Sequence, residues 1–182
     1  EPYFQATLQQ FIQSSLVKKI IVEHGGDFSG KIEKCKGMKV DSLTSGKTVN
    51  ALIEKLSTKF LLFVNQAQSI TLNQAALERF VHIANDTNAG MVYSDFYEVK
   101  EGKRSEHPTI DYQLGSIRDN FDFGAVMSFS TAAIKKAVKR YGKIEKVERS
   151  GLYDLRLKVS IDHPIFHNQE FLYTKTESDT RK

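Results

Sequence analysis

The feature that most constrains the fold is an alternation of short strand-like runs with segments whose apolar residues recur at helical spacing. Such alternation predicts βαβ units, and therefore an α/β chain with a mostly parallel central sheet covered by helices on both faces. The expected architecture is a three-layer α/β/α sandwich of the Rossmann-like kind. The strand-like runs are Lys18–Val22, Met38–Val40, Phe60–Val64 and Gly90–Tyr93, and the helical segments are residues 2–15, 49–56 and 72–85.

The pattern becomes less regular after Asp95. Residues 151–159 fit either an alternating strand or a helix, and we favour the helix because Leu152, Leu155 and Val159 would share one face. The other expected elements are a hairpin over residues 96–103, a polar connection over 107–120, a strand over 123–129, a helix over 132–141 and a strand over 166–173.

Length and composition narrow the class of protein. The 182 residues, 40% of them hydrophobic, suit a single domain, 1–182. A single cysteine, Cys35, excludes a disulfide framework and favours a cytoplasmic location. The net charge is +4, but the basic residues alternate with acidic ones, so we expect no nucleic-acid partner. No apolar run reaches the ~20 residues of a membrane helix, so we expect no transmembrane segment.

The segment Ser45–Thr48 resembles part of a phosphate-binding P-loop, which follows the pattern G-x-x-x-x-G-K-[ST]. That pattern requires glycine where this chain has Asp41, so we exclude a P-loop. Two interpretations of the segment stay open. In one, the N-terminus of a helix that starts here helps to bind a diphosphate; in the other, Ser45 only caps that helix.

Histidine and cysteine give no catalytic or metal motif. His163 and His167 are four residues apart, but Pro164 disfavours a helix that would bring them together.

Carboxylates are more informative. Ligands of parallel α/β sheets bind beyond the carboxyl ends of the strands, so Asp95 and Asp154 are candidates for one cleft, the alternative being turn or cap chemistry. Asp111, Asp119 and Asp122 fit loop and turn chemistry.

The order of segments resembles a family-2 glycosyltransferase of the GT-A fold, in a Bacteroides-type bacterial branch. The likeness covers most of the chain. It is carried by Ser15-Leu16 leading into Ile20–Gly25, Ser45-Gly46 with Asn50, the apolar run Phe60–Val64, the helix segment Ala76–Phe80, the run Tyr93–Glu98, the segment from His107-Pro108 to Gly124, and Tyr153–Leu157. The family transfers a sugar from a nucleotide-sugar donor to an acceptor hydroxyl.

The resemblance implies roles for individual residues. Asp154 would be the general base that takes the proton of the acceptor hydroxyl, giving inversion at the anomeric carbon. Glu23, His24 and Asn50 would help to hold the donor nucleotide, and Asp95 would line the cleft. The implied partners are a UDP- or GDP-sugar and a glycan or lipid-linked acceptor, in bacterial polysaccharide synthesis.

The family's cofactor is Mn²⁺ or Mg²⁺ held by an Asp-x-Asp pair. In this chain the corresponding stretch contains Asn65 and Ala67, so the motif is degenerate. Neutral amides replace anionic ligands, and we expect metal affinity to fall sharply. Two other positions also differ from the family pattern. Glu23-His24 keeps only one carboxylate of the acidic pair that holds the nucleotide, and Tyr153 replaces the glutamate of the motif that carries the base.

Two further hypotheses compete with the enzyme. One is a non-catalytic GT-A-like module that binds a nucleotide-sugar or glycan without the metal chemistry, and the other is a scaffold domain of a larger polysaccharide-assembly protein. The resemblance also implies an apolar first strand before Glu1 and a continuation beyond Lys182 in a longer parent protein.

Overall fold

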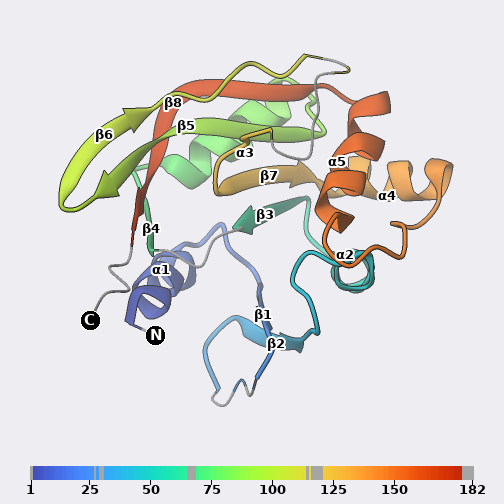
Figure 1. The fold of residues 1–182 in the computed structure, drawn as a ribbon, viewed down its shortest axis with the longest axis horizontal. Helices are drawn as coiled ribbons and strands as arrows, with labels where there is room; N and C mark the ends of the chain where they lie inside the picture. The colour runs from blue at the N-terminus through green and yellow to red at the C-terminus, as the bar shows by residue number, and fades with distance from the viewer. Residues whose placement is uncertain are drawn as a thin grey trace.

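We describe a computed structural model of the chain, which covers residues 2–26, 28, 31–64, 69–113, 115 and 121–177. Helices and strands are interspersed along it (Figure 1). The helices are α1 (Pro2–Gln13), α2 (Gly46–Glu54), α3 (Ala76–Asp86), α4 (Thr131–Tyr141) and α5 (Gly151–Asp162). The strands are β1 (Ile20–His24), β2 (Cys35–Lys39), β3 (Phe60–Val64), β4 (Ser69–Leu72), β5 (Met91–Lys100), β6 (Lys103–His107), β7 (Val126–Ser130) and β8 (Ile165–Thr176).

The strands of the described residues form two sheets. The main sheet has six strands in the order β3-β7-β5-β8-β4, with β6 paired to β5, and it curls over at the β6 end (Figure 1). The strands β1 and β2 form a separate parallel pair. The predicted α/β class is confirmed, and helices lie on both faces of the main sheet.

The prediction of a mostly parallel sheet is wrong, because the main sheet is mixed. Of its pairings among the described residues, only that of β5 with β8 is parallel. β7 runs back between β3 and β5, so both of its pairings are antiparallel. β6 is antiparallel because it returns through the tight turn Glu101-Gly102, where both residues have a positive φ, as hairpin turns require. A local pattern shows that a segment is a strand, but it does not show which neighbour the strand pairs with.

Most predicted elements are confirmed, although the bounds of several of them differ. Residues 151–162 form a helix, and the hairpin after Asp95 is present. A helix is predicted over residues 72–85, but residues 69–72 form strand β4. The helix therefore begins at Ala76. The strand predicted to end at Tyr93 continues to Lys100, so Asp95 lies within a strand instead of after one.

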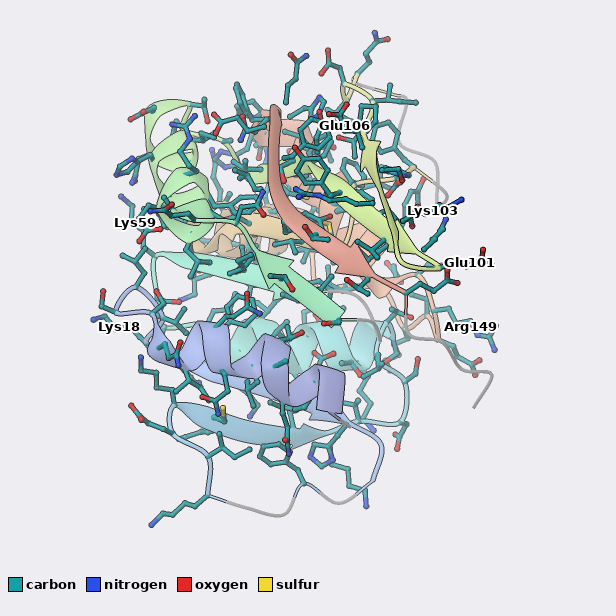
Figure 2. The ribbon with its side chains drawn as sticks, turned by 90° about the vertical axis from the view of Figure 1, so that its left-hand side faces the viewer. Lys18, Lys59, Glu101, Lys103, Glu106 and Arg149 are labelled. Atoms are coloured by element: carbon teal, nitrogen blue, oxygen red, sulfur yellow. The ribbon has the colours of Figure 1, made fainter. Side chains whose placement is uncertain are left out.

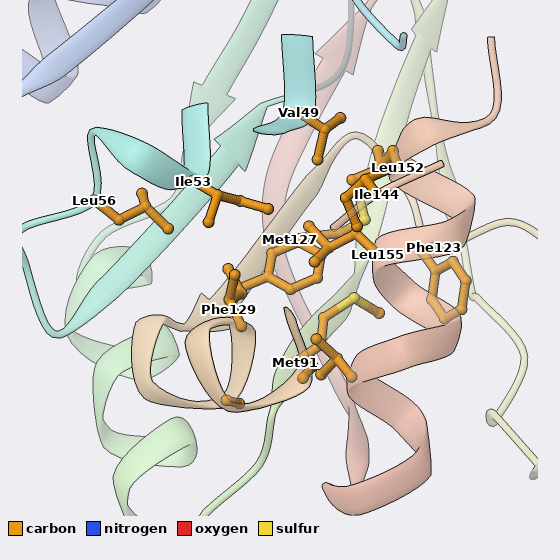
Figure 3. Packing of buried hydrophobic residues seen from close by; sticks show 14 of the residues in the cluster. Val49, Ile53, Leu56, Met91, Phe123, Met127, Phe129, Ile144, Leu152 and Leu155 are labelled. Carbon is orange, nitrogen blue, oxygen red and sulfur yellow. The ribbon is translucent and has the colours of Figure 1, made fainter. Parts of the chain in front are cut away.

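Two cores flank the main sheet because side chains alternate along each strand. On one face, Met91 and Met127 pack against α2, α4 and α5 (Figure 3). On the other face, Val92 and Phe96 pack against α3, whose Phe80 is 1% exposed. Burial on both faces explains why β5 and β7 are almost wholly buried. The main sheet is therefore the rigid platform on which polar groups are placed.

Candidate functional site

Buried polar residues begin on β5 at the level where β3 ends. Val64, the last residue of β3, pairs with Val126, while Tyr93 on β5 pairs with Met127. Ser94 and Asp95 therefore lie level with the carboxyl end of β3, and both are at least 95% buried. Carboxyl ends of strands are where α/β sheets bind ligands, so this level of the sheet is the first place to look for a site.

Asp95 is the centre of a hydrogen-bonded group that we call the Asp95–His167 cluster, consisting of Asp95, Thr109, Asp111 and His167. The Oδ1 atom of Asp95 accepts hydrogen bonds from the Thr109 N–H at 2.7 Å and from the Thr109 hydroxyl at 2.9 Å. The Nε2 atom of His167 lies 2.8 Å from the same oxygen, and its Nδ1 atom lies 2.5 Å from Oδ1 of Asp111. The imidazole thus connects a buried carboxylate to an exposed one, because the side chain of Asp95 is 6% exposed and that of Asp111 is 69% exposed.

Tyr93 holds the polar connection over this cluster. Its ring stacks on His167 with centroids 4.9 Å apart. Its hydroxyl donates to the carbonyl of Ile110 at 2.6 Å and accepts from the N–H of Tyr112 at 2.8 Å. Burial raises the pKa of this hydroxyl, so it stays a donor across the physiological range. The predicted polar connection is therefore tied to the sheet at Thr109, Ile110 and Tyr112.

Arg156 places a buried cation on the same face of the sheet. Its guanidinium lies 4.8 Å from the centre of the Phe123 ring, and its Nε atom has no hydrogen-bond partner. The residue is 9% exposed, and burial lowers its pKa to about 10. No carboxylate of the described residues forms an ion pair with it. A buried arginine without a carboxylate partner is a group to which an anion can bind.

Asp154 lies in the first turn of α5, on another side of the helix from Arg156. Its Oδ2 atom accepts from Lys158 Nζ at 2.6 Å and from the N–H of Glu145 at 3.0 Å. Lys158 also donates to the carbonyl of Lys143. None of the described contacts joins Asp154 to Asp95, so the structure does not bring the two predicted carboxylates into one hydrogen-bonded group.

Asn50 and Gly46 connect α2 to the segment before α5, and Ser45 stands at the start of α2. The Asn50 amide donates to the carbonyl of Ile144 at 3.0 Å and accepts from its N–H at 3.0 Å. Ser45 Oγ accepts from the N–H of Thr48 at 3.1 Å, so Ser45 caps the helix. The N–H of Gly46 donates to Val147, and a Cβ atom at Gly46 would lie 1.8 Å from the carbonyl oxygen of Glu145. The segment before α5 therefore covers the start of α2. The hydrogen bond from the N–H of Thr48 to Ser45 confirms the interpretation of Ser45 as a helix cap.

Glu23 and His24 lie at the carboxyl end of β1, away from these groups. Glu23 lines an apolar slot beside β1, and its Oε1 atom is buried without a hydrogen-bond partner. Burial raises the pKa of Glu23 to about 7. His24 Nδ1 lies 2.8 Å from the carbonyl of Gly26, and its ring stacks on Phe28. The four donor-binding candidates and Asp154 therefore occupy three separate places: the end of β1, the α2–α5 contact and the middle of β5.

The residues with described positions do not fit the divalent metal that the resemblance implies. Asn65 and Ala67 lie outside the described residues. Elsewhere in the described chain, no group of three or more His, Cys, Asp or Glu side chains is arranged to hold a metal ion. We therefore derive no chemical step through a metal.

Comparisons with solved structures cover nearly the whole chain at low sequence identity. S. aureus TarS 1–349 in complex with UDP-GlcNAc matches with a TM-score of 0.67 and 14% identity, over 100% of this chain and 56% of that chain. S. aureus TarS 1–349 in complex with UDP matches with a TM-score of 0.65 and 13% identity, over 97% of this chain and 57% of that chain. Francisella tularensis 2-C-methyl-D-erythritol 4-phosphate cytidylyltransferase (IspD) matches with a TM-score of 0.54 and 12% identity, over 95% of this chain and 77% of that chain.

The chain has a GT-A-like fold. Identities this low show the fold alone, and the chain spans little more than half the length of the TarS 1–349 structures. The neighbours are a protein solved with UDP-GlcNAc or UDP and a cytidylyltransferase, so the fold by itself does not select one reaction. No protein-family model and no curated protein sequence matches the chain. No helix in the described part of the chain is both long enough and apolar enough to span a membrane.

Sequence reasoning did not assign His167, Thr109 or Arg156 to a site. His167 was considered only as a partner of His163, because the two lie close in sequence. Its actual partner, Asp95, is 72 residues away, and only the pairing of β5 with β8 brings them together. Arg156 carried no distinguishing signal, because the charged residues Asp154 and Lys158 lie in the same predicted helix.

Proposed function

We propose that this domain transfers a sugar from a nucleoside-diphosphate sugar to an acceptor hydroxyl on a glycan or lipid-linked glycan. The observation that carries the proposal is the GT-A-like fold along the full described chain, shared with a protein solved with UDP-GlcNAc. The motif resemblance at residues 153–157 adds a candidate base, Asp154, in the first turn of α5. A role in bacterial polysaccharide synthesis follows from that resemblance.

In the proposed reaction, the acceptor oxygen attacks the anomeric carbon while the bond from that carbon to the diphosphate oxygen breaks. The hydroxyl proton passes to the carboxylate of Asp154, and the nucleoside diphosphate leaves with its negative charge. Lys158 would hold the Asp154 carboxylate in place through its 2.6 Å contact. Glu23, His24, Asn50 and Asp95 are the candidates for donor binding.

A binding module without catalysis is the second candidate, and one observation favours it. The carboxylate of Asp154 is engaged by Lys158 and by the N–H of Glu145, and both bonds fall on Oδ2. Through these bonds Asp154 ties α5 to the segment before it, which is a structural role that requires no acceptor. The module hypothesis leaves Asp154 in that role, because it needs donor or glycan binding alone.

The first experiment is a calorimetric titration of the purified chain with UDP, GDP and their common sugar conjugates, with and without Mn²⁺. Given the side chains at residues 65 and 67, we expect donor binding that does not depend on Mn²⁺. Binding without any sugar transfer would favour the module. No binding at all would contradict both hypotheses and favour a scaffold.

The second experiment is the substitution Asp154→Asn, which removes the base but keeps the size of the side chain. Sugar transfer is expected to fall by roughly 10²–10⁴-fold while donor binding is retained. Asp162→Asn is the matched control, because Asp162 lies at the other end of α5, where it pairs with Arg140. Unchanged transfer by the Asp154 variant would remove Asp154 from the mechanism.

A further inference from the structure

The positive charge of the chain is concentrated in one segment, which consists of helix α4 and the residues that follow it. Of the fifteen residues from 135 to 149, seven are Lys or Arg and two are Glu. The formal net charge of this segment is therefore +5, whereas that of the whole chain is +4. We call the seven basic side chains the basic surface: Lys135, Lys136, Lys139, Arg140, Lys143, Lys146 and Arg149.

The basic surface lies at one end of the molecule. In Figure 1, α4 and the chain that joins it to α5 form the right-hand end, opposite the curled part of the main sheet. Figure 2 shows Arg149 at the outer edge of the molecule. All seven residues are exposed, and α4 buries its other side in the core through Ala133, Ile134 and Ala137. The basic side chains of α4 therefore lie on the outward side of the helix.

Most of the basic surface has no anionic partner within the described chain. Arg140 pairs with Asp162 at 2.8 Å, and Lys143 pairs with Glu54 at 3.2 Å. The other five basic side chains form no ion pair with any described residue. Their charge is thus available to an anion outside the chain.

The stability of the fold does not explain this arrangement. Lys135 and Lys139 are four residues apart on α4, and so are Lys136 and Arg140, so like charges stand one turn apart on the same helix. Such pairs destabilise a helix. Lys139 and Arg140 lie in the last turn, where the helix dipole favours a cation, but Lys135 and Lys136 lie before that turn. An external anionic surface would relieve the repulsion, so the arrangement favours binding.

Two exposed apolar side chains, Leu43 and Val147, accompany the basic ones. Leu43 is 54% exposed and Val147 is 37% exposed. Their segments lie side by side, because the Ser42 hydroxyl donates to the carbonyl of Glu148 at 2.8 Å. Exposed apolar side chains among basic ones are typical of proteins that lie on an anionic bilayer, where the apolar groups enter the headgroup region.

We propose that the basic surface binds an anionic lipid bilayer, with Leu43 and Val147 entering its headgroup region. Lipid phosphates supply negative charge over a broad area, which suits cations that are spread along a helix and the segment after it. A single-stranded nucleic acid would also require aromatic side chains for stacking. The only aromatic residue of the segment, Tyr141, is half-buried and donates its hydroxyl to Asp162.

A bilayer would hold the domain beside a lipid-linked acceptor. The inference nevertheless goes beyond the proposed sugar transfer and does not depend on it, because binding to vesicles requires neither a donor nor an acceptor. Loss of sugar transfer in any variant would leave the vesicle measurements unchanged, so the two proposals can fail separately.

The first test is co-sedimentation of the 182-residue chain with vesicles of phosphatidylcholine, with or without phosphatidylglycerol as the anionic lipid. We expect binding only to the anionic vesicles. It should be at least about tenfold weaker in 1 M NaCl, because the Debye length falls from about 10 Å at 0.1 M to about 3 Å at 1 M. Equal binding to both kinds of vesicle, or binding to neither, would overturn the proposal. So would tighter binding to a short DNA duplex than to the anionic vesicles at the same salt concentration.

The second test reverses two charges of the α4 face, with Lys135→Glu and Lys139→Glu combined. Affinity for the anionic vesicles is expected to fall about 25-fold, from roughly fivefold for each basic residue near such a surface. The matched control combines Lys36→Glu and Lys39→Glu on β2, which gives the same net charge at exposed positions and should lose less than about threefold. Equal losses would show that net charge alone drives binding and would overturn the proposal. Urea denaturation checks that both variants fold.

The third test removes the apolar side chains, with Leu43→Ser and Val147→Ser combined, and leaves the charge unchanged. Affinity for the anionic vesicles is expected to fall about tenfold, because less apolar surface leaves water. The ratio of the affinities at the two salt concentrations should stay the same. An unchanged affinity would overturn the entry of these side chains into the headgroup region, and with it the assignment of the basic surface to a bilayer.

Discussion

The six-stranded sheet and the β1–β2 pair treat a buried carboxyl group in opposite ways. Burial alone would raise the pKa of Glu98 on β5, but the hydrogen bonds and charges of Lys100 and Lys175, each 2.8 Å away, outweigh it and lower the pKa to about 2. Glu23 on β1 has no such partner among the described residues, and burial raises its pKa to about 7. The comparison teaches that the main sheet supplies partners for the carboxyl group of Glu98, whereas the described residues leave the carboxyl group of Glu23 on β1 unpaired.

The largest difference is expected from removing one methionine side chain in each sheet. Met127 on β7 is 1% exposed within the main core, and Met38 on β2 is 8% exposed. We expect Met127→Ala to lower the free energy of unfolding by about 3–5 kcal/mol, and Met38→Ala by at most about 2 kcal/mol, because Met38 belongs to neither of the two core clusters. Urea denaturation measures both. Equal losses would show that the two sheets are equally well packed.

A smaller effect is expected from acid at Glu98. A carboxyl group whose pKa is lowered on folding contributes stability above its ordinary value of 4.5, and this contribution is lost as the pH falls from 4.5 toward 2. We expect a loss of about 2 kcal/mol, reduced by solvent screening because Lys100 is exposed. Glu98→Gln should remove this loss from the pH dependence of urea denaturation. Glu106→Gln, at an exposed position of the same hairpin, is the control, and an equal response there would exclude the lysine pairs as the cause.

The smallest effect, with the opposite sign, is expected at Glu23. A carboxyl group whose pKa is raised on folding stabilises the fold while it is protonated, so stability falls as the pH rises from 4.5 to about 7. We expect about 1 kcal/mol, well below the full shift, because the carboxyl is only partly buried. Glu23→Gln should abolish this fall and stabilise the chain at pH 8, while Glu33→Gln, at an exposed position, should not. A wild-type stability that is flat between pH 4.5 and 7 would contradict the pKa assigned to Glu23.

The same two regions differ in how well sequence reasoning anticipated them. The elements of the main sheet could be predicted because buried strands and amphipathic helices leave periodic apolar patterns, as at Phe60–Val64 and in α5. The strand order could not be predicted. β7 inserts between β3 and β5, and that choice depends on which edges and faces fit together across more than thirty residues of sequence.

The candidate site likewise contains residues that the sequence could interpret and residues that it could not. The sequence offered two interpretations of Ser45, a diphosphate site at a helix start or a helix cap, and the structure shows that Ser45 caps α2. His167 and Thr109 could not be found this way, because neither carries a motif. Their contacts with Asp95 exist because β8 lies beside β5 and because the connection after β6 folds back over the sheet.

The sequence by itself determined the α/β class and the positions of most helices and strands, because these depend on short-range periodicity. The role of Asp154 as a base stays a prediction from the resemblance. The tertiary structure alone decided that the sheet is mixed, that Asp95 bonds to a histidine 72 residues away, and that Asp154 and Asp95 lie in separate groups. It also decided that residues of β1 and β3 line one slot. The physical reason is that pairing between strands satisfies backbone groups that every residue carries, so the side-chain sequence leaves only a weak record of which strands will pair.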